Sequence, residues 1–174
     1  MRLDLGCGKS KKEGFIGVDS VEFPGVDVVT DLTKAWPWQD DTVDEVFCSH
    51  FLEHLDQQER IHFANELHRV MKKGAKAQIV TPDAWSGRAL GDPTHKMPPV
   101  VPFAYLYWNK GWRDTQAPHT DSANNPTGFK CDFDHGAGYS IPPEFQGRNM
   151  EFNQFATAHY LEARGDLQVT LTKR

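Results

Sequence analysis

The feature that most constrains the fold is a glycine-rich turn directly after the first apolar run. Gly6 and Gly8 follow the residues RLDL at the start of the chain. Glycine lets a backbone approach a ligand closely because it has no Cβ. A second short apolar run, over 15–18, ends in Asp19, and an acid at this place can accept hydrogen bonds from two ribose hydroxyls. The plan is typical of a nucleotide site, although a glycine pair alone also fits an ordinary tight turn.

This pattern resembles the first motif of class I S-adenosylmethionine (SAM) dependent methyltransferases, in particular the methyltransferase type 11 group. Asp4 and the two glycines match the acidic-x-Gly-x-Gly core of that motif, and Asp19 matches its ribose-binding acid. The family usually has a third glycine where this chain has Ser10, followed by a helix of several turns. Here residues 9–14 leave room for a loop or a single helical turn. We therefore expect a smaller contribution from a helix N-terminus to ligand binding.

Length, charge and cysteine content limit the class of protein. A chain of 174 residues suits one domain with one core. The net charge of -5 argues against a broad nucleic-acid surface, although Lys9, Lys11 and Lys12 leave a local basic patch open. The three cysteines are odd in number and widely spaced, which favours a reducing compartment over a disulfide framework. Since no apolar run is long enough to span a membrane and no leader is visible, we predict a cytoplasmic protein.

A third strand is predicted over 26–30, a short β-branched run that ends in Asp31. In the family that the chain resembles, the residue after this strand contacts the adenine amino group. The resemblance thus implies that Asp31 and the Leu32 amide lie beside the base. An aspartate that merely forms a turn explains the same residue equally well.

The fourth predicted strand, over 43–48, opens into SHFLEHL, which resembles the Leu-Glu-His segment of the same family. Open α/β sheets bind ligands at the carboxyl ends of their strands, where Ser49 and His50 follow. The match also implies that His54 packs at the start of the next helix. The cofactor-binding set that the resemblance implies is Asp4, Gly6, Gly8, Asp19, Ser20, Asp31, Leu32, Ser49 and His50.

A long helix is predicted over 56–73. Asp56 and Glu59 have the spacing of a capping box, apolar residues repeat at helical intervals, and Gly74 follows two lysines at the end. A fifth, buried strand is then expected over 75–81.

From 84 to 150 the regular pattern fails, because proline, glycine, asparagine and aspartate are frequent. Only 103–108 has the pattern of a short helix, and the aromatic residues around it favour a small satellite core. We interpret 84–150 as a lid, a substrate-binding insertion or an oligomer contact through which a homodimer could form. Cys131, Asp134 and His135 have metal-binding side chains but lack a tight zinc spacing, so no metal site is expected.

Two strand-like runs, over 152–162 and 167–173, are predicted to close the chain as a hairpin around 163–166. The resemblance implies a single Rossmann-like α/β domain over 1–174. Its mostly parallel seven-stranded sheet would have the order 3-2-1-4-5-7-6, with an antiparallel strand contributed by the C-terminal hairpin.

The resemblance implies SAM as methyl donor and S-adenosylhomocysteine as product. Methyl transfer is an in-line displacement that depends on alignment, and a hydroxyl acceptor also needs a base. His50 and His95 are the candidate catalytic residues, because they follow the fourth and fifth strands; either could instead cap a loop. We expect a small-molecule hydroxyl as acceptor. The alternatives are a SAM-fold binding or scaffold protein without turnover, and a methyltransferase that acts on nucleic acid or protein.

Overall fold

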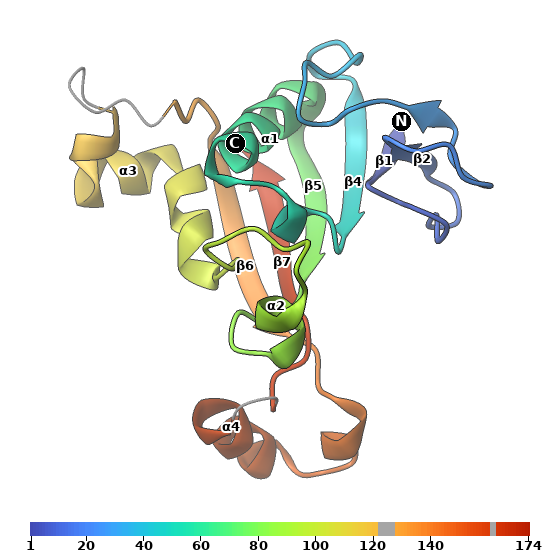
Figure 1. The fold of residues 1–174 in the computed structure, drawn as a ribbon. Coiled ribbons are helices and arrows are strands. Elements are labelled where there is room, and N and C mark those ends of the chain that lie inside the picture. The colour runs from blue at the N-terminus through green and yellow to red at the C-terminus, as the bar shows by residue number, and fades with distance from the viewer. Residues whose placement is uncertain (122–127, 161–162) are drawn as a thin grey trace.

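The computed structural model describes residues 1–121, 128–160 and 163–174. These residues form a seven-stranded sheet with the order β3-β2-β1-β4-β5-β7-β6 (Figure 1). β7 runs antiparallel to β5 and β6, whereas the other neighbours are parallel. The predicted fold class is confirmed. The strands are β1 (Arg2–Leu5), β2 (Ile16–Asp19), β3 (Val28–Val29), β4 (Val43–Ser49), β5 (Met71–Thr81), β6 (Phe133–Tyr139) and β7 (Leu167–Lys173).

The long helix α1 (Gln57–Val70) begins as predicted. The Asp56 carboxylate accepts the Glu59 N–H at 2.9 Å, and the Glu59 carboxylate accepts the Asp56 N–H at 2.8 Å. The predicted end at residue 73 is wrong, because Met71 is extended and pairs with Val43 at the start of β5. Burial of the Met71 side chain favours this earlier end.

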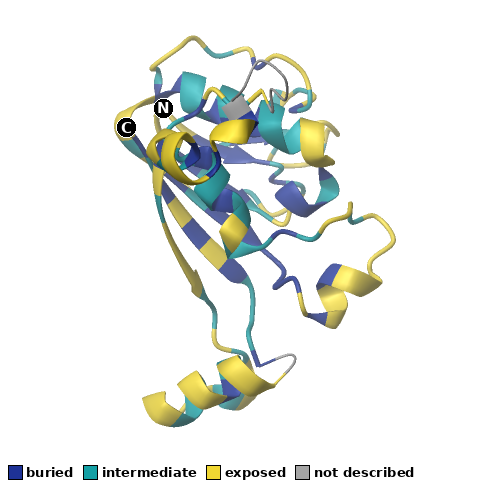
Figure 2. Cartoon of the chain, turned by 90° about the vertical axis from the view of Figure 1, so that its left-hand side faces the viewer, coloured by how far each residue is buried: buried dark blue, intermediate teal, exposed yellow. Residues whose placement is uncertain are grey.

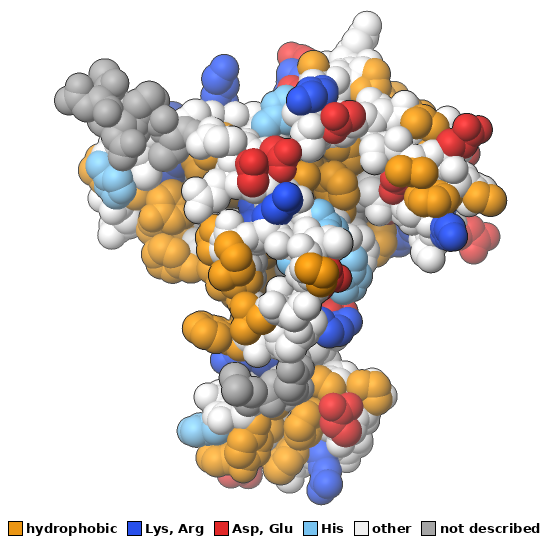
Figure 3. Space-filling model, viewed as in Figure 1, with side chains coloured by type: hydrophobic (Ala, Val, Ile, Leu, Met, Phe, Trp, Pro, Cys, Tyr) orange, Lys and Arg blue, Asp and Glu red, His pale blue; other side chains and the backbone are white. Residues whose placement is uncertain are grey.

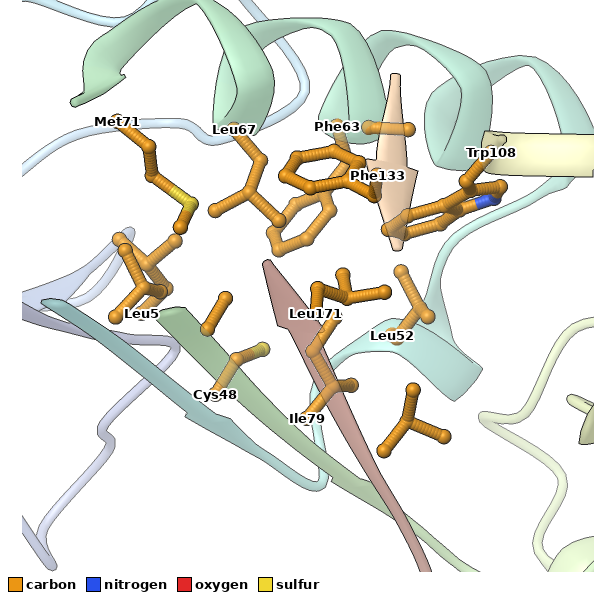
Figure 4. Close-up of a cluster of buried hydrophobic side chains, with 14 of the residues drawn as sticks. Leu5, Cys48, Leu52, Phe63, Leu67, Met71, Ile79, Trp108, Phe133 and Leu171 are labelled. Carbon is orange, nitrogen blue, oxygen red and sulfur yellow. The ribbon is translucent and has the colours of Figure 1, made fainter. Parts of the chain in front are cut away.

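The hydrophobic core lies between α1 and one face of the sheet. Figure 4 shows Phe63 and Leu67 of α1 above Leu171 of β7. Along β7, residues at alternate positions are buried and the residues between them are mostly exposed. Figure 2 shows this alternation as a striped strand, so the second face of the sheet is more open to solvent at this edge.

β6 lies inside the range 84–150, where the sequence predicted no strand. Of its seven residues only Phe133 is buried, and a Cβ added at Gly136 or Gly138 would meet nothing within 4 Å. An edge strand with two glycines and one buried side chain lacks the apolar alternation by which strands are recognised. The prediction failed here because pairing with β7, and not side-chain pattern, makes this segment a strand.

The predicted strand over 152–162 is also wrong. Residues 150–159 form the helix α4 (Met150–His159), and Asn149 caps it by accepting the Phe152 N–H at 2.8 Å; residues 161–162 lie outside the described part. Phe152, Phe155 and Ala156 have helical spacing, so the period was misread. α4 extends away from the sheet (Figure 1), and hydrophobic side chains cover part of its surface (Figure 3).

Short helices connect the remaining elements. Residues 102–108 form a 3-10 helix over the predicted short helix. Tyr105 and Trp108 within it are buried in the main core, where the sequence predicted a separate satellite core. No helix in the described ranges is both long and apolar enough to cross a membrane. The short helices are η1 (Leu52–His54), α2 (Gly87–Gly91), η2 (Pro102–Trp108), α3 (Lys110–Gln116), η3 (Pro118–Asp121) and η4 (Pro143–Phe145).

Candidate functional site

The glycine turn is fixed by backbone hydrogen bonds to the neighbouring strand. The N–H groups of Gly6 and Cys7 both donate to the Val18 carbonyl, at 2.8 and 3.1 Å. Gly6 has a φ of +68°, and a Cβ at this position would lie 2.5 Å from a ring carbon of Phe51. The turn therefore needs glycine at position 6 for both conformation and space.

Two carboxylates hold the turn from either side. Asp4 is buried and accepts the Lys12 N–H at 2.7 Å; burial raises its pKa, and this hydrogen bond partly opposes the shift. Asp19 accepts the Gly8 N–H through Oδ2 at 2.9 Å and the Val21 N–H through Oδ1 at 3.0 Å. Since a carboxylate oxygen has two lone pairs, each oxygen of Asp19 can accept one more hydrogen bond.

Residues 9–14 form turns and no helix, which confirms the predicted loop. The side chains of Lys11 and Lys12 connect this loop to the rest of the domain. The Lys11 Nζ lies 2.9 Å from the Asp27 carboxylate, and the Lys12 Nζ lies 4.0 Å from the ring centroid of Phe47 on β4. Cation–π contacts of this kind stabilise by about 0.5–1 kcal/mol at exposed sites.

The residues after β2 and β3 lie along the same edge of the sheet as the glycine turn. Ser20 and Asp31 are exposed, and Leu32 is buried. One oxygen of Asp31 accepts the N–H of Thr33 at 2.9 Å and its hydroxyl at 2.7 Å, which lowers the pKa of Asp31. Asp31 therefore forms the turn that was the alternative interpretation, and its other oxygen takes no part in these two bonds.

The end of β4 carries the next predicted pair, Ser49 and His50. His50 has a φ of +54°, a sparsely populated conformation for a residue other than glycine. Its N–H donates to the Val80 carbonyl at 2.9 Å. The Nδ1 atom lies 3.3 Å from Glu53 Oε1, and Nε2 lies 3.5 Å from Asp166 Oδ2. Contact with Glu53 and then the charge of Asp166 raise the pKa of His50 against the effect of burial.

His50 and His95 both line a cavity of about 500 Å³, which we call the histidine cavity. The Lys96 N–H donates to the Glu53 carbonyl at 2.8 Å and so joins the segment after α2 to η1. The ring centroids of His54 and His95 are 4.9 Å apart. The two candidate catalytic residues therefore share one cavity. Its lining consists of His50, Glu53, His54, Pro82, Gly87, Arg88, Gly91, Asp92 and His95.

Comparison with known proteins bears on the fold. Residues 9–79 match the family model described as a methyltransferase domain, of type 11. A SAM-dependent methyltransferase from Archaeoglobus fulgidus is 23% identical, with a TM-score of 0.65; the match covers 99% of this chain and 85% of that one. The chain has the fold of class I methyltransferases, and residues 9–79 carry the match to the methyltransferase domain.

Two further solved structures share this fold at lower identity. A Haloferax volcanii methyltransferase, solved in complex with the Trm112 methyltransferase activator, is 17% identical, with a TM-score of 0.55 and coverage of 99% and 81%. A methyltransferase from Listeria monocytogenes is 15% identical, with a TM-score of 0.55 and coverage of 99% and 89%. No curated protein matches the sequence.

Sequence reasoning missed several residues that line the histidine cavity or contact His50 beside it. Glu53 was visible only as part of the Leu-Glu-His match, and Asp92 only as the first residue of the DPTH stretch. Asp166 was read as a hairpin turn, yet its carboxylate contacts both Arg88 and His50. These groups meet only through the tertiary structure, so sequence spacing carried little signal for them.

A second cavity of about 530 Å³ lies between α1 and η2, with a mostly apolar lining that includes Ile61, Val101 and Phe129. Arg60 is the charged residue among those that line it. Its guanidinium donates to the carbonyls of three residues, namely Leu52, Lys96 and Pro98. This second cavity therefore offers mostly apolar surface, whereas the lining of the histidine cavity contains several ionisable side chains.

Proposed function

We propose that this methyltransferase transfers the methyl group of SAM to a hydroxyl oxygen of a small molecule. The observation that carries the proposal is the position of His50, which directly follows β4 and lies between the glycine turn and the histidine cavity. Leu5 of β1 pairs with Cys48 of β4, so the turn after one strand and His50 after the other lie side by side. A donor on one side of His50 and an acceptor on the other would bring the reacting atoms together.

On the donor side, Gly6 and Gly8 would contact the methionine part of SAM. The two oxygens of Asp19 would accept hydrogen bonds from the ribose hydroxyls, which suits their remaining lone pairs. Asp31 and Leu32 would lie beside the adenine. The remaining candidate contacts are Asp4 and Ser20 near the turn, and Ser49 and His50 beside the sulfonium.

On the acceptor side, the histidine cavity has the size of a small-molecule site. The Nδ1 atom of His95 lies 3.1 Å from the Ala89 carbonyl. Because a carbonyl only accepts, Nδ1 carries the proton and Nε2 is left to accept one. A hydroxyl becomes a better nucleophile as it loses its proton, so His95 is our first candidate for this step and His50 the second.

The segment 84–150 would serve this reaction as a lid. Support comes from Gly87, Arg88 and His95, which line the histidine cavity from this segment. A homodimer through the same segment stays a prediction. So does a cytoplasmic location, with which the three buried free cysteines are consistent.

The two alternative functions receive less support. The short loop over 9–14 had favoured a scaffold without turnover, yet the turn keeps its backbone hydrogen bonds without a helix. For nucleic acid, the basic patch is partly occupied: Lys11 pairs with Asp27, and Lys9 and Lys12 lie over aromatic rings. A small-molecule acceptor therefore remains the better proposal.

The donor side is tested by calorimetry with SAM and S-adenosylhomocysteine. We expect Asp19→Ala to weaken SAM binding about 100-fold, because hydrogen bonds to a charged group stabilise by roughly 1.5–3 kcal/mol. Glu22→Ala, which removes a nearby exposed acid, should leave the affinity unchanged. If the folded wild-type protein binds neither compound, or if Asp19→Ala binds SAM as well as wild type, the proposed donor site is wrong.

The acceptor side is tested by transfer of a labelled methyl group to a panel of small hydroxyl compounds, with the product located by mass spectrometry. We expect His95→Ala to lower kcat by about 100-fold or more at unchanged SAM affinity. His135→Ala, a histidine on β6, serves as the matched control. Full activity of His95→Ala would remove this residue from the reaction, and a methyl group found on nitrogen would contradict a hydroxyl acceptor.

A further inference from the structure

We propose that Glu53, His54 and His95 form a binding site for a divalent transition metal ion such as Zn²⁺. Each side chain offers one ligand atom, and these atoms all lie within 4.8 Å of one another. Glu53 and His54 belong to η1, whereas His95 comes from the segment after α2. The sequence predicted no metal site, and its metal-capable residues pointed instead to the region of Cys131, which is buried beneath Trp108.

The first argument is the buried carboxylate of Glu53. Its side chain is 6% exposed, and neither oxygen accepts a hydrogen bond of ordinary geometry from the described residues. A buried carboxylate without compensation is costly, by several kcal/mol. The Arg60 guanidinium donates hydrogen bonds to the backbone carbonyls of Leu52, Lys96 and Pro98. His50 Nδ1 lies 3.3 Å from one oxygen, so the second oxygen in particular lacks a partner that a cation would supply.

The second argument is the orientation of the two imidazoles. Nδ1 of His54 lies 3.3 Å from the Thr94 carbonyl, and Nδ1 of His95 lies 3.1 Å from the Ala89 carbonyl. In both rings Nδ1 is then the donor, and Nε2 keeps its lone pair. Histidines that bind metals commonly hold the ring in this way, with the other nitrogen donating to a carbonyl or carboxylate.

The ligand types define the metal. Two imidazole nitrogens with one carboxylate oxygen suit zinc and its neighbours in the first transition row better than Mg²⁺ or Ca²⁺, which prefer oxygen ligands alone. Asp92 Oδ2 lies 3.6 Å from His95 Nε2 and is close enough to become a fourth ligand after a small shift. Three protein ligands otherwise leave a position open toward the cavity, as in catalytic zinc sites.

The inference rests on these side chains and not on methyl transfer, although a metal ion bound to Nε2 of His95 would occupy the lone pair that a base needs, so that His50 would then be the candidate base. Metal binding without methyl transfer would overturn only the proposed function. Methyl transfer without metal binding would overturn only this inference.

The test begins with the full chain, stripped of metal by chelation. Titration with Co²⁺ should give visible d–d bands that saturate at one ion per chain, Zn²⁺ should abolish them, and Zn²⁺ should raise Tm while Mg²⁺ leaves it unchanged. If Co²⁺ gives no bands and Zn²⁺ does not change Tm, no site exists.

Variants then assign the ligands. Glu53→Gln and His95→Ala should each weaken Zn²⁺ binding at least about 100-fold, a loss greater than the 10–100-fold typical of residues that only orient a ligand. His135→Ala should bind Zn²⁺ as wild type does. Should Glu53→Gln fail to fold, the more exposed His95→Ala decides the question. Wild-type Zn²⁺ affinity in His95→Ala would overturn the site.

Discussion

The two sides of the β4 end are built in different ways. On the donor side, the glycine turn is held by Val18 and Asp19, which lie little more than ten residues along the chain. On the acceptor side, the histidine cavity joins Glu53 and His95, and Asp166 contacts His50 at its edge, although the three residues are far apart in sequence. The donor side can form from local backbone geometry, whereas the acceptor side exists only when distant segments have docked. The first is therefore the more visible in a sequence.

Arg60 is the clearest device for this docking. It lies on α1, yet its guanidinium binds the carbonyl of Leu52 in η1 and the carbonyls of Lys96 and Pro98 after α2. One planar cation with several donors thus joins the two segments that bring Glu53 and His95 into the histidine cavity. Separate changes to the two sides should consequently have separate effects.

The largest effect is expected on the donor side, from Gly6→Ala. A side chain at this φ costs about 1–2 kcal/mol, and displacing the Phe51 ring adds about 1–3 kcal/mol. We expect a loss of about 3 kcal/mol in the free energy of unfolding, measured by urea denaturation. Gly8→Ala is the control, since φ is also positive but nothing lies within 4 Å; its cost should be about 1 kcal/mol. Equal costs would mean that Phe51 moves away freely.

On the acceptor side, Arg60→Ala should lower the free energy of unfolding by about 2 kcal/mol, because three carbonyls lose a charged donor. The same variant should weaken Zn²⁺ binding while SAM affinity stays unchanged, since His95 immediately precedes the pinned segment. Arg60→Lys should recover only part of the stability, as an ammonium cannot copy the planar fork. A parallel loss of SAM affinity would show that the two sides are not independent.

The smallest effect is expected from Glu66 on α1, which holds the segment that follows β3. The Glu66 carboxylate accepts hydrogen bonds from Arg69 and from the Trp36 N–H, at 2.7 and 2.8 Å. The Arg69 hydrogen bond lowers the pKa of Glu66. Its stabilisation is therefore fully present above the unfolded pKa of about 4.3 and is lost as pH falls through the lower folded value.

Glu66→Gln should accordingly cost about 1 kcal/mol at pH 7 and progressively less below pH 4. Urea denaturation of both proteins across this pH range measures the difference. Glu59→Gln is the control on the same helix, because it removes the charge of an acid that forms the capping box and no ion pair with Arg69. A difference between wild type and Glu66→Gln that does not shrink in acid would contradict the ion pair as its cause.

The sequence predicted the features that depend on residues close together in the chain better than those that depend on distant segments. The capping box at Asp56 and the loop over 9–14 were predicted correctly, because each depends on neighbours along the chain. The end of α1 was missed, since pairing of Met71 with Val43 overrides helical propensity. The helix α4 was missed because its apolar residues were assigned to the two-residue period of a strand, although their spacing also fits a helix.

By itself, the sequence determined the glycine turn, the acid that ends the second strand and the long capped helix, whereas the order of the strands in the sheet came from the resemblance to the methyltransferase family. Tertiary structure alone decided that Phe133–Tyr139 would become β6, through backbone pairing with β7. It also decided that Glu53 and His95 would share one cavity. Backbone turns and caps are encoded over a few residues. Edge-strand pairing and a buried carboxylate facing two histidines depend on contacts between segments whose separation a single sequence does not reveal.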